Sequence, residues 1–134
     1  MAGFAVGIRK FFEAQPHRAL AVYLYGSTAR GSALPGSDID LAILYDLTPE
    51  PTLEGLPLSL ESDLERLAGR PVQVVVLNQA PADLVHRVLR DGKLLLDRDR
   101  AARIRFEVRA RNEFFDLAPI RQRYRKLSMP ADRP

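Results

Sequence analysis

One uninterrupted apolar run places the strongest limit on how this chain can fold. Residues 19–25 read Ala-Leu-Ala-Val-Tyr-Leu-Tyr and end at Gly26, so neither face of a strand built from them would be polar. A strand with one solvated face alternates apolar and polar side chains, whereas a strand covered on both faces is apolar throughout. We therefore predict a central strand over residues 19–25, with further elements packed on both of its faces.

The elements expected around this strand alternate between helix and strand. Apolar residues at helical spacing predict three helices: one that Pro16 ends, one that ends before Gly69, and one between Pro81 and Gly92. A last helix is expected to begin near Asp99 and to be broken or bent at Pro119, before a second helical piece at 120–127. Short apolar runs predict strands over 38–45, 72–77 and 93–96. This order indicates the α/β (α+β) class, with a small mixed sheet of about four strands and helices packed on it.

Length and composition narrow the possible functions. The chain has 134 residues, the length of one domain (1–134), whose basic C-terminal helical region spans about 99–127. It has no cysteine, which excludes disulfides, thiolate metal sites and cysteine nucleophiles, and leaves only His17 and His86 for imidazole chemistry. No apolar run approaches the roughly 20 residues that span a bilayer, and Arg9 and Lys10 interrupt the start. We expect a cytoplasmic protein that does not enter membranes.

Two short motifs between the first two strands carry the chemistry. Gly26-Ser27 leaves the first strand, and ten residues later Asp38-Ile39-Asp40 opens the second. Glycine and serine at the start of a helical turn offer backbone N–H groups and a hydroxyl, which suit phosphate oxygens. Two aspartates at i and i+2 on a strand project from the same face and can share a hard cation. Each motif alone also fits a plain loop or turn, but the combination at this spacing favours phosphate and metal chemistry.

The spacing also identifies a family that this sequence resembles. Gly-Ser, ten residues, Asp-x-Asp is the signature of the minimal nucleotidyltransferases (MNT) of the DNA polymerase β-like superfamily. The stretches Ala29-Arg30-Gly31 and Gly69-Arg70-Pro71-Val72, together with Ser37, also resemble that family. The arginine-rich end, with Phe106, is similar to the C-terminal helix of members that are paired with HEPN toxins, in which the nucleotidyltransferase is the antitoxin.

The resemblance implies an activity and a partner. By this likeness the chain is expected to transfer AMP from ATP, with Mg²⁺ or Mn²⁺, to a tyrosine of a HEPN RNase toxin with which it forms a hetero-oligomer. Gly26 and Ser27 would hold the triphosphate, and Asp38 and Asp40 would be the catalytic metal ligands. Arg30 could also contact a phosphate as part of the nucleotide site, but an ion pair on the protein surface is the favoured interpretation of this residue.

The sequence departs from the family at the third carboxylate. The family supplies an aspartate from the next long strand, and Gln73 stands in that place here, within Val-Gln-Val-Val. A glutamine can offer an oxygen but cannot take a proton. Asp97, at the end of the predicted fourth strand, is another acid that could take this role. The departure leaves a slow, one-metal or catalytically inactive protein as possible outcomes.

Three functions therefore remain open. The first is a nucleotidyltransferase that modifies a partner protein, and the second is a nucleotide-binding antitoxin that is catalytically weak or inactive and neutralises its partner by direct binding. The third, a nucleic-acid-binding module, draws on residues 98–134, which hold 11 Arg and Lys against 5 Asp and Glu. Part of that charge is expected to form i, i+4 pairs in the last helix, between Arg103 and Glu107, Glu107 and Arg111, and Arg109 and Glu113. The apolar side of this helix would be Ile104, Val108 and Phe115.

Overall fold

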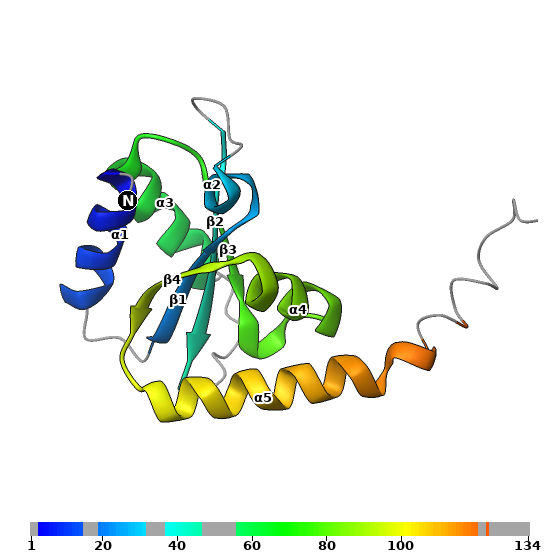
Figure 1. Ribbon diagram of the computed structural model, residues 1–134. Coiled ribbons are helices and arrows are strands. Elements are labelled where there is room, and N and C mark those ends of the chain that lie inside the picture. The colour runs from blue at the N-terminus through cyan, green and yellow to red at the C-terminus, as the bar shows by residue number, and fades with distance from the viewer. Residues whose placement is uncertain (1–2, 15–18, 32–36, 47–55, 121–122, 124–134) are drawn as a thin grey trace, which may run out of the picture.

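A computed structural model describes residues 3–14, 19–31, 37–46, 56–120 and 123 of the chain. Helices and strands alternate along it, as expected (Figure 1): α1 (Gly3–Ala14), β1 (Ala19–Tyr25), α2 (Gly26–Arg30), β2 (Ile39–Tyr45), α3 (Leu56–Ala68), β3 (Val72–Val76), the 3₁₀ turn η1 (Leu77–Gln79), α4 (Ala82–Asp91), β4 (Lys93–Asp97) and α5 (Arg100–Asp116). The prediction of a mixed sheet of four strands in an α/β fold is confirmed.

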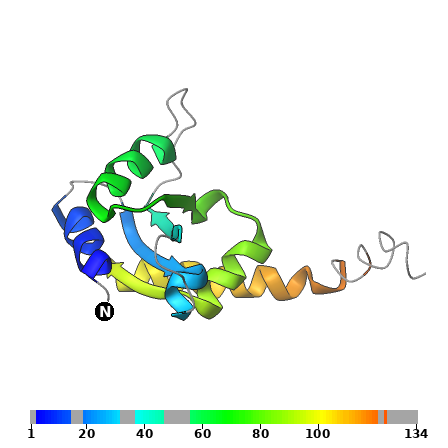
Figure 2. The same ribbon diagram turned by 90° about the horizontal axis from the view of Figure 1, so that it is seen from above.

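The sheet explains why residues 19–25 are apolar throughout. Its strand order is β3-β2-β1-β4, with β1 antiparallel to both β2 and β4 and with β2 parallel to β3. Val22 and Leu24 of β1 face the core under α1 and α3, whereas Ala21 and Tyr23 face the core under α4 and α5. Figures 1 and 2 show these two helix layers on opposite faces of the sheet. The central strand is therefore covered on both sides.

The last helix differs from expectation at its end. It stops at Asp116, where the Leu117 N–H group closes the last turn on the Glu113 carbonyl, 3.1 Å away. After the turn at Leu117 the chain is helical again over residues 118–120, so the break falls two residues before Pro119 and Pro119 lies in the second piece. Most of the second piece expected at 120–127 lies outside the described residues. No helix in the described part of the chain is long and apolar enough to cross a membrane.

The side on which α5 packs also differs from expectation. Ile104, Val108 and Phe115 are exposed, and the helix instead turns Phe106 and Ala110 toward the sheet and α4. A half-buried polar network holds this side in place. Tyr23 Oη donates a hydrogen bond to Glu107 over 2.7 Å. Arg103 forms ion pairs with Asp97 over 2.9 Å and with Glu107 over 3.0 Å, and Arg111 lies 3.9 Å from Glu107. The expected pairs of Glu107 with Arg103 and Arg111 are thereby confirmed.

Candidate functional site

The candidate residues meet at one edge of the sheet. Asp40, the second residue of β2, lies opposite Tyr25 at the end of β1 and opposite Gln73 near the start of β3. Asp38 precedes β2 by one residue, and Gly26 follows β1 directly. Because β2 is antiparallel to β1 and parallel to β3, the end of one strand and the starts of the other two share this edge. The topology thus brings Gly26, Asp38, Asp40 and Gln73 together.

Gln73 contacts the aspartate pair directly. Its Nε2 atom donates a hydrogen bond to Asp38 Oδ2 over 3.0 Å, and both side chains are exposed. Asp40 is partly buried, and this burial raises the pKa of its carboxyl group, with the charge of Asp38 as a second cause. Among the described residues, no group of three or more Asp, Glu or His side chains is placed to hold a metal ion. The oxygen donors at this edge are thus two carboxylates and one amide.

The raised pKa of Asp40 predicts a pH-dependent stability. A carboxyl group with a folded pKa above its unfolded value costs stability once pH rises above the unfolded value of about 3.9, and the cost is complete above the folded pKa. In a buffer that contains a metal chelator, we expect Asp40→Asn to raise the unfolding temperature at pH 7 by roughly 1–3 °C. The effect is this small because solvent screens a partly exposed carboxylate. The gain should disappear near pH 3. Thermal unfolding of both proteins across this range checks it, and an unchanged or lower unfolding temperature at pH 7 would contradict it.

Gly26 allows the chain to pass close to Asp40. Its φ is +74°, in the left-handed region, and a Cβ atom built on it would overlap Asp40 Oδ2. Ser27 follows in the first turn of α2 and is partly buried, while Ala29 is buried beneath the helix. α2 begins at Gly26, so the helical turn follows β1 directly and Gly26 and Ser27 stand at its start. The turn that is expected to receive phosphate therefore lies directly against Asp40.

Arg30 lies at the end of α2, and its side chain is exposed. The pKa of Asp91 on α4 is lowered, first by a hydrogen bond from Arg90 and, among the weaker causes, by the charge of Arg30. Both interpretations of Arg30, a surface ion pair and a phosphate contact, stay predictions.

Arg70 is a positioning residue that sequence analysis did not single out. Its Nε and Nη2 atoms donate to the Ser37 carbonyl over 3.0 and 2.7 Å, and its guanidinium lies 5.2 Å from the centre of the Phe4 ring. The Ile39 N–H group also donates to the Pro71 carbonyl over 2.8 Å. These bonds tie the backbone on both sides of Asp38 to the segment that leads into β3. The only sequence signal was that Arg70 lies in a stretch resembling the family.

Carboxylates of α3 hold the strand that carries Gln73. Glu65 accepts a hydrogen bond from the Val72 N–H group over 3.1 Å, and Glu61 accepts one from the Val74 N–H group over 2.6 Å. Both bonds lie on the outer edge of β3, where none of the described strands runs alongside. They satisfy backbone donors that an edge strand otherwise leaves open. Gln73, between these two residues, is thereby fixed beside Asp38.

Two other sequence candidates lie away from this edge. Asp97 pairs with Ala21 near the opposite end of β1 and forms an ion pair with Arg103, so the prediction that it could replace the third carboxylate is wrong. His86 packs its ring flat on Phe114 of α5, with the ring centres 3.7 Å apart, and this contact helps to hold α4 against α5. His17 lies outside the described residues.

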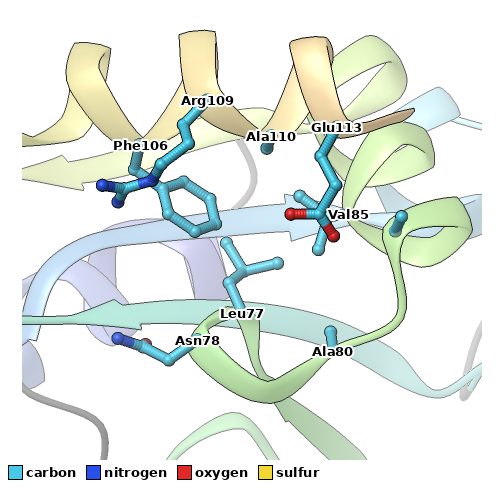
Figure 3. A pocket seen from close by; sticks show the side chains of 9 residues that line it. Leu77, Asn78, Ala80, Val85, Phe106, Arg109, Ala110 and Glu113 are labelled. Atoms are coloured by element: carbon cyan, nitrogen blue, oxygen red, sulfur yellow. The ribbon is translucent and has the colours of Figure 1, made fainter. Parts of the chain in front are cut away.

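A cavity of about 270 Å³ lies between η1, α4 and α5. Figure 3 shows Leu77, Val85 and Phe106 in its wall, with Arg109 and Glu113 of α5 beside them. Neither aspartate nor Gln73 lines it. The cavity is thus separate from the site at the sheet edge.

Comparison with known proteins points in the same direction. Residues 7–101 match the family described as Polymerase beta, Nucleotidyltransferase. A chain of a toxin–antitoxin crystal structure with AMP-PNP is 24% identical, with a TM-score of 0.76 over 92% of this chain and 95% of that one. A chain from a complex of a tri-AMPylated Shewanella oneidensis HEPN toxin with its MNT antitoxin is 24% identical, with a TM-score of 0.72 over 90% and 92%.

A third similar chain comes from a mutant MntA–HepT toxin–antitoxin complex, with 26% identity and a TM-score of 0.71 over 87% of this chain and 89% of that one. No curated protein matches the sequence closely enough to serve as a relative. The family match covers more than half of the chain and contains every residue of the sheet-edge site. The chain belongs to the polymerase beta nucleotidyltransferase family.

Proposed function

We propose that this chain is a nucleotidyltransferase-type antitoxin that transfers AMP from ATP to a partner protein, a tyrosine of a HEPN toxin. The observation that supports it most is the approach of Gly26 to Asp40, which sets a phosphate-binding turn against a pair of carboxylates. Similar chains occur in complexes that contain AMP-PNP or an AMPylated HEPN toxin. A related complex carries a mutation of two aspartates, two positions apart, to glutamate.

The donor set fits a divalent cation. Asp38 and Asp40 are hard oxygen ligands of the kind that Mg²⁺ and Mn²⁺ prefer, and the charge of Asp38 already raises the pKa of Asp40. A cation held by both carboxylates would offset this repulsion. When bound, it would supply neutralisation of the triphosphate charge. Gln73 would hold Asp38 through the hydrogen bond from its Nε2 atom. The Oε1 atom of Gln73 would then remain as a further, uncharged oxygen ligand for the cation.

The residues of this chain would mainly position the reactants. Gly26 and Ser27 would bind the triphosphate through first-turn N–H groups, which lack partners within a helix, and through the serine hydroxyl. The tyrosine oxygen of the partner would bond to the α-phosphorus, the bond between the α-phosphorus and the bridging oxygen would break, and pyrophosphate would leave. The phenol proton, with a pKa near 10, must pass to water because Gln73 cannot accept it. We therefore expect slow transfer.

The decisive experiment measures the intact mass of the small protein encoded beside this chain. After co-expression with the intact chain, we expect AMP-sized mass increments on the partner. Co-expression with an Asp38→Asn, Asp40→Asn double variant should give none, because neither asparagine offers the charge that holds a cation. The double variant should still fold, since it removes a repulsion between the two carboxylates. Circular dichroism and co-purification of the partner are the controls.

A catalytically weak or inactive antitoxin is the second candidate, and the bond from Gln73 to Asp38 favours it. The same measurement separates the two functions. If the partner is bound and silenced but its mass never changes, the chain neutralises by contact and the transferase proposal is wrong. If the increments persist with the double variant, Asp38 and Asp40 do not carry the reaction and the assigned site is wrong.

A further inference from the structure

α5 is apolar on two opposite sides. Phe106 and Ala110 pack on the body of the protein, while Ile104, Val108 and Phe115 are 39%, 49% and 62% exposed. Residues two positions apart on a helix lie roughly 200° apart around its axis, so Ile104 points away from the side that carries Phe106. A helix at the surface of a globular protein has one apolar stripe. A second stripe on the opposite side is typical of a helix that lies between two layers, and the described part of this chain supplies only one.

The charges beside this outer stripe have one sign. Arg100, Arg105 and Arg111 border it and are exposed. Glu107 is turned inward to Tyr23, its side chain is only 13% exposed, and it reaches Arg111 only over 3.9 Å. The acidic residue nearest the stripe is therefore used within the protein. Figures 1 and 2 show α5 running along the margin of the molecule, with its C-terminal part extending past α4. Within the described part of the chain, Ile104, Val108 and Phe115 stay exposed along this face, although the Phe115 ring also lies edge-on to His86 of α4, with the ring centres 6.2 Å apart.

We infer that the outer face of α5, defined by Ile104, Val108, Arg111 and Phe115, docks the toxin partner through an apolar surface bordered by carboxylates. This inference rests on the proposed function, because it takes the acceptor protein as the occupant. The charges select that occupant: a second copy of this chain would bring arginines to face arginines, and like charges across an interface oppose association. An acidic border on the partner would instead complement Arg100, Arg105 and Arg111.

Docking on this face is separate from the chemistry. β4 leads into α5 from the end at which Asp97 pairs with Ala21, while Asp40 and Tyr25 pair near the other end of β1. Changes on the outer face should therefore leave the binding of ATP unchanged and alter only the engagement of the partner. Transfer would fall through a higher KM for the partner, with kcat at saturating partner retained.

The test compares two exposed valines. Val108→Asp places a carboxylate in the centre of the outer face, and Val6→Asp makes the same change on α1, where Val6 is 42% exposed. We expect Val108→Asp to weaken the affinity for the neighbouring toxin by at least about tenfold, as for a central interface residue. Val6→Asp should change it by less than about twofold, and both variants should keep the unfolding temperature of the intact chain. Calorimetric titration of the toxin measures the affinities, and titration with AMP-PNP checks the nucleotide site.

Two results would overturn this inference while leaving the proposed function standing. One is an unchanged toxin affinity for Val108→Asp. The other is a concentration-dependent dimer of the free chain in sedimentation that Val108→Asp abolishes, because a second copy would then cover the face. An intact chain that binds the toxin but never modifies it would remove the transferase proposal and leave the docking surface intact. An intact chain that does not bind the toxin would reject both.

Discussion

Gln73→Asp is expected to raise the rate of AMP transfer by about 10²-fold, the lower range of what a positioned general base contributes. Gln73 already lies within hydrogen-bond distance of Asp38, so an aspartate there would join the two existing carboxylates. It would add an oxygen ligand with negative charge and a group able to take the phenol proton. Single-turnover transfer to the purified partner, followed by intact mass, measures the gain.

Gln73→Asn is the matched control, since it shortens the side chain as aspartate does but adds no charge. It should give no gain. A third carboxylate would also repel Asp38 and Asp40. The pKa of Asp40 is already raised, first by burial and then by the charge of Asp38. Gln73→Asp should therefore lower the unfolding temperature in chelator and make it rise more steeply with Mg²⁺. Transfer that stays at the level of the intact chain, despite this stronger response to Mg²⁺, would show that the third carboxylate is not what limits the reaction.

The fold was predictable where a local pattern of apolar residues indicates which side chains are buried. The apolar run at 19–25 predicted a central strand covered on both faces, and this is confirmed. Strand order depends on which edges meet after the helices pack, which no local pattern contains. The outer side of α5 was misread because spacing alone cannot tell an apolar stripe that packs inward from one that faces solvent, and the helix has both. Its anchor, Tyr23 with Glu107, joins residues 84 positions apart.

The arrangement of the candidate residues was predictable in part. Strand alternation predicted that Asp38 and Asp40 share a face, but β2 begins at Ile39, so Asp38 lies one residue before the strand. The parallel pairing of β2 with β3 places Gln73 opposite Asp40, and the Gln73 side chain reaches Asp38. Asp97 was a plausible third acid only while strand order was unknown, because its antiparallel pairing puts it at the other end of β1. The hold of Arg70 on the Ser37 carbonyl could not be foreseen, since a bond from a side chain to a distant backbone carbonyl leaves no trace in composition or periodicity.

Gly26→Ala is expected to lower transfer by about 10²-fold or more, which is the scale of a displacement of about 1 Å in a reacting site. Its φ of +74° costs an alanine about 1–2 kcal/mol, and the new Cβ would overlap Asp40 Oδ2. Either Asp40 or the start of α2 must move, and both are assigned to hold the reactants. Transfer to the partner and AMP-PNP affinity measure the effect, and both should fall.

Gly31→Ala separates the two causes. Gly31 has nearly the same φ, +75°, but a Cβ atom there meets nothing within 4 Å. Both variants should lose about 1–2 kcal/mol of stability from the left-handed backbone. Gly26→Ala should lose more through the overlap with Asp40, and only Gly26→Ala should lose nucleotide binding. Equal losses of transfer in the two variants would mean that the backbone of α2, and not the contact with Asp40, makes glycine necessary at position 26. If Gly26→Ala retained full transfer, the phosphate turn and the aspartate pair would not work as one site.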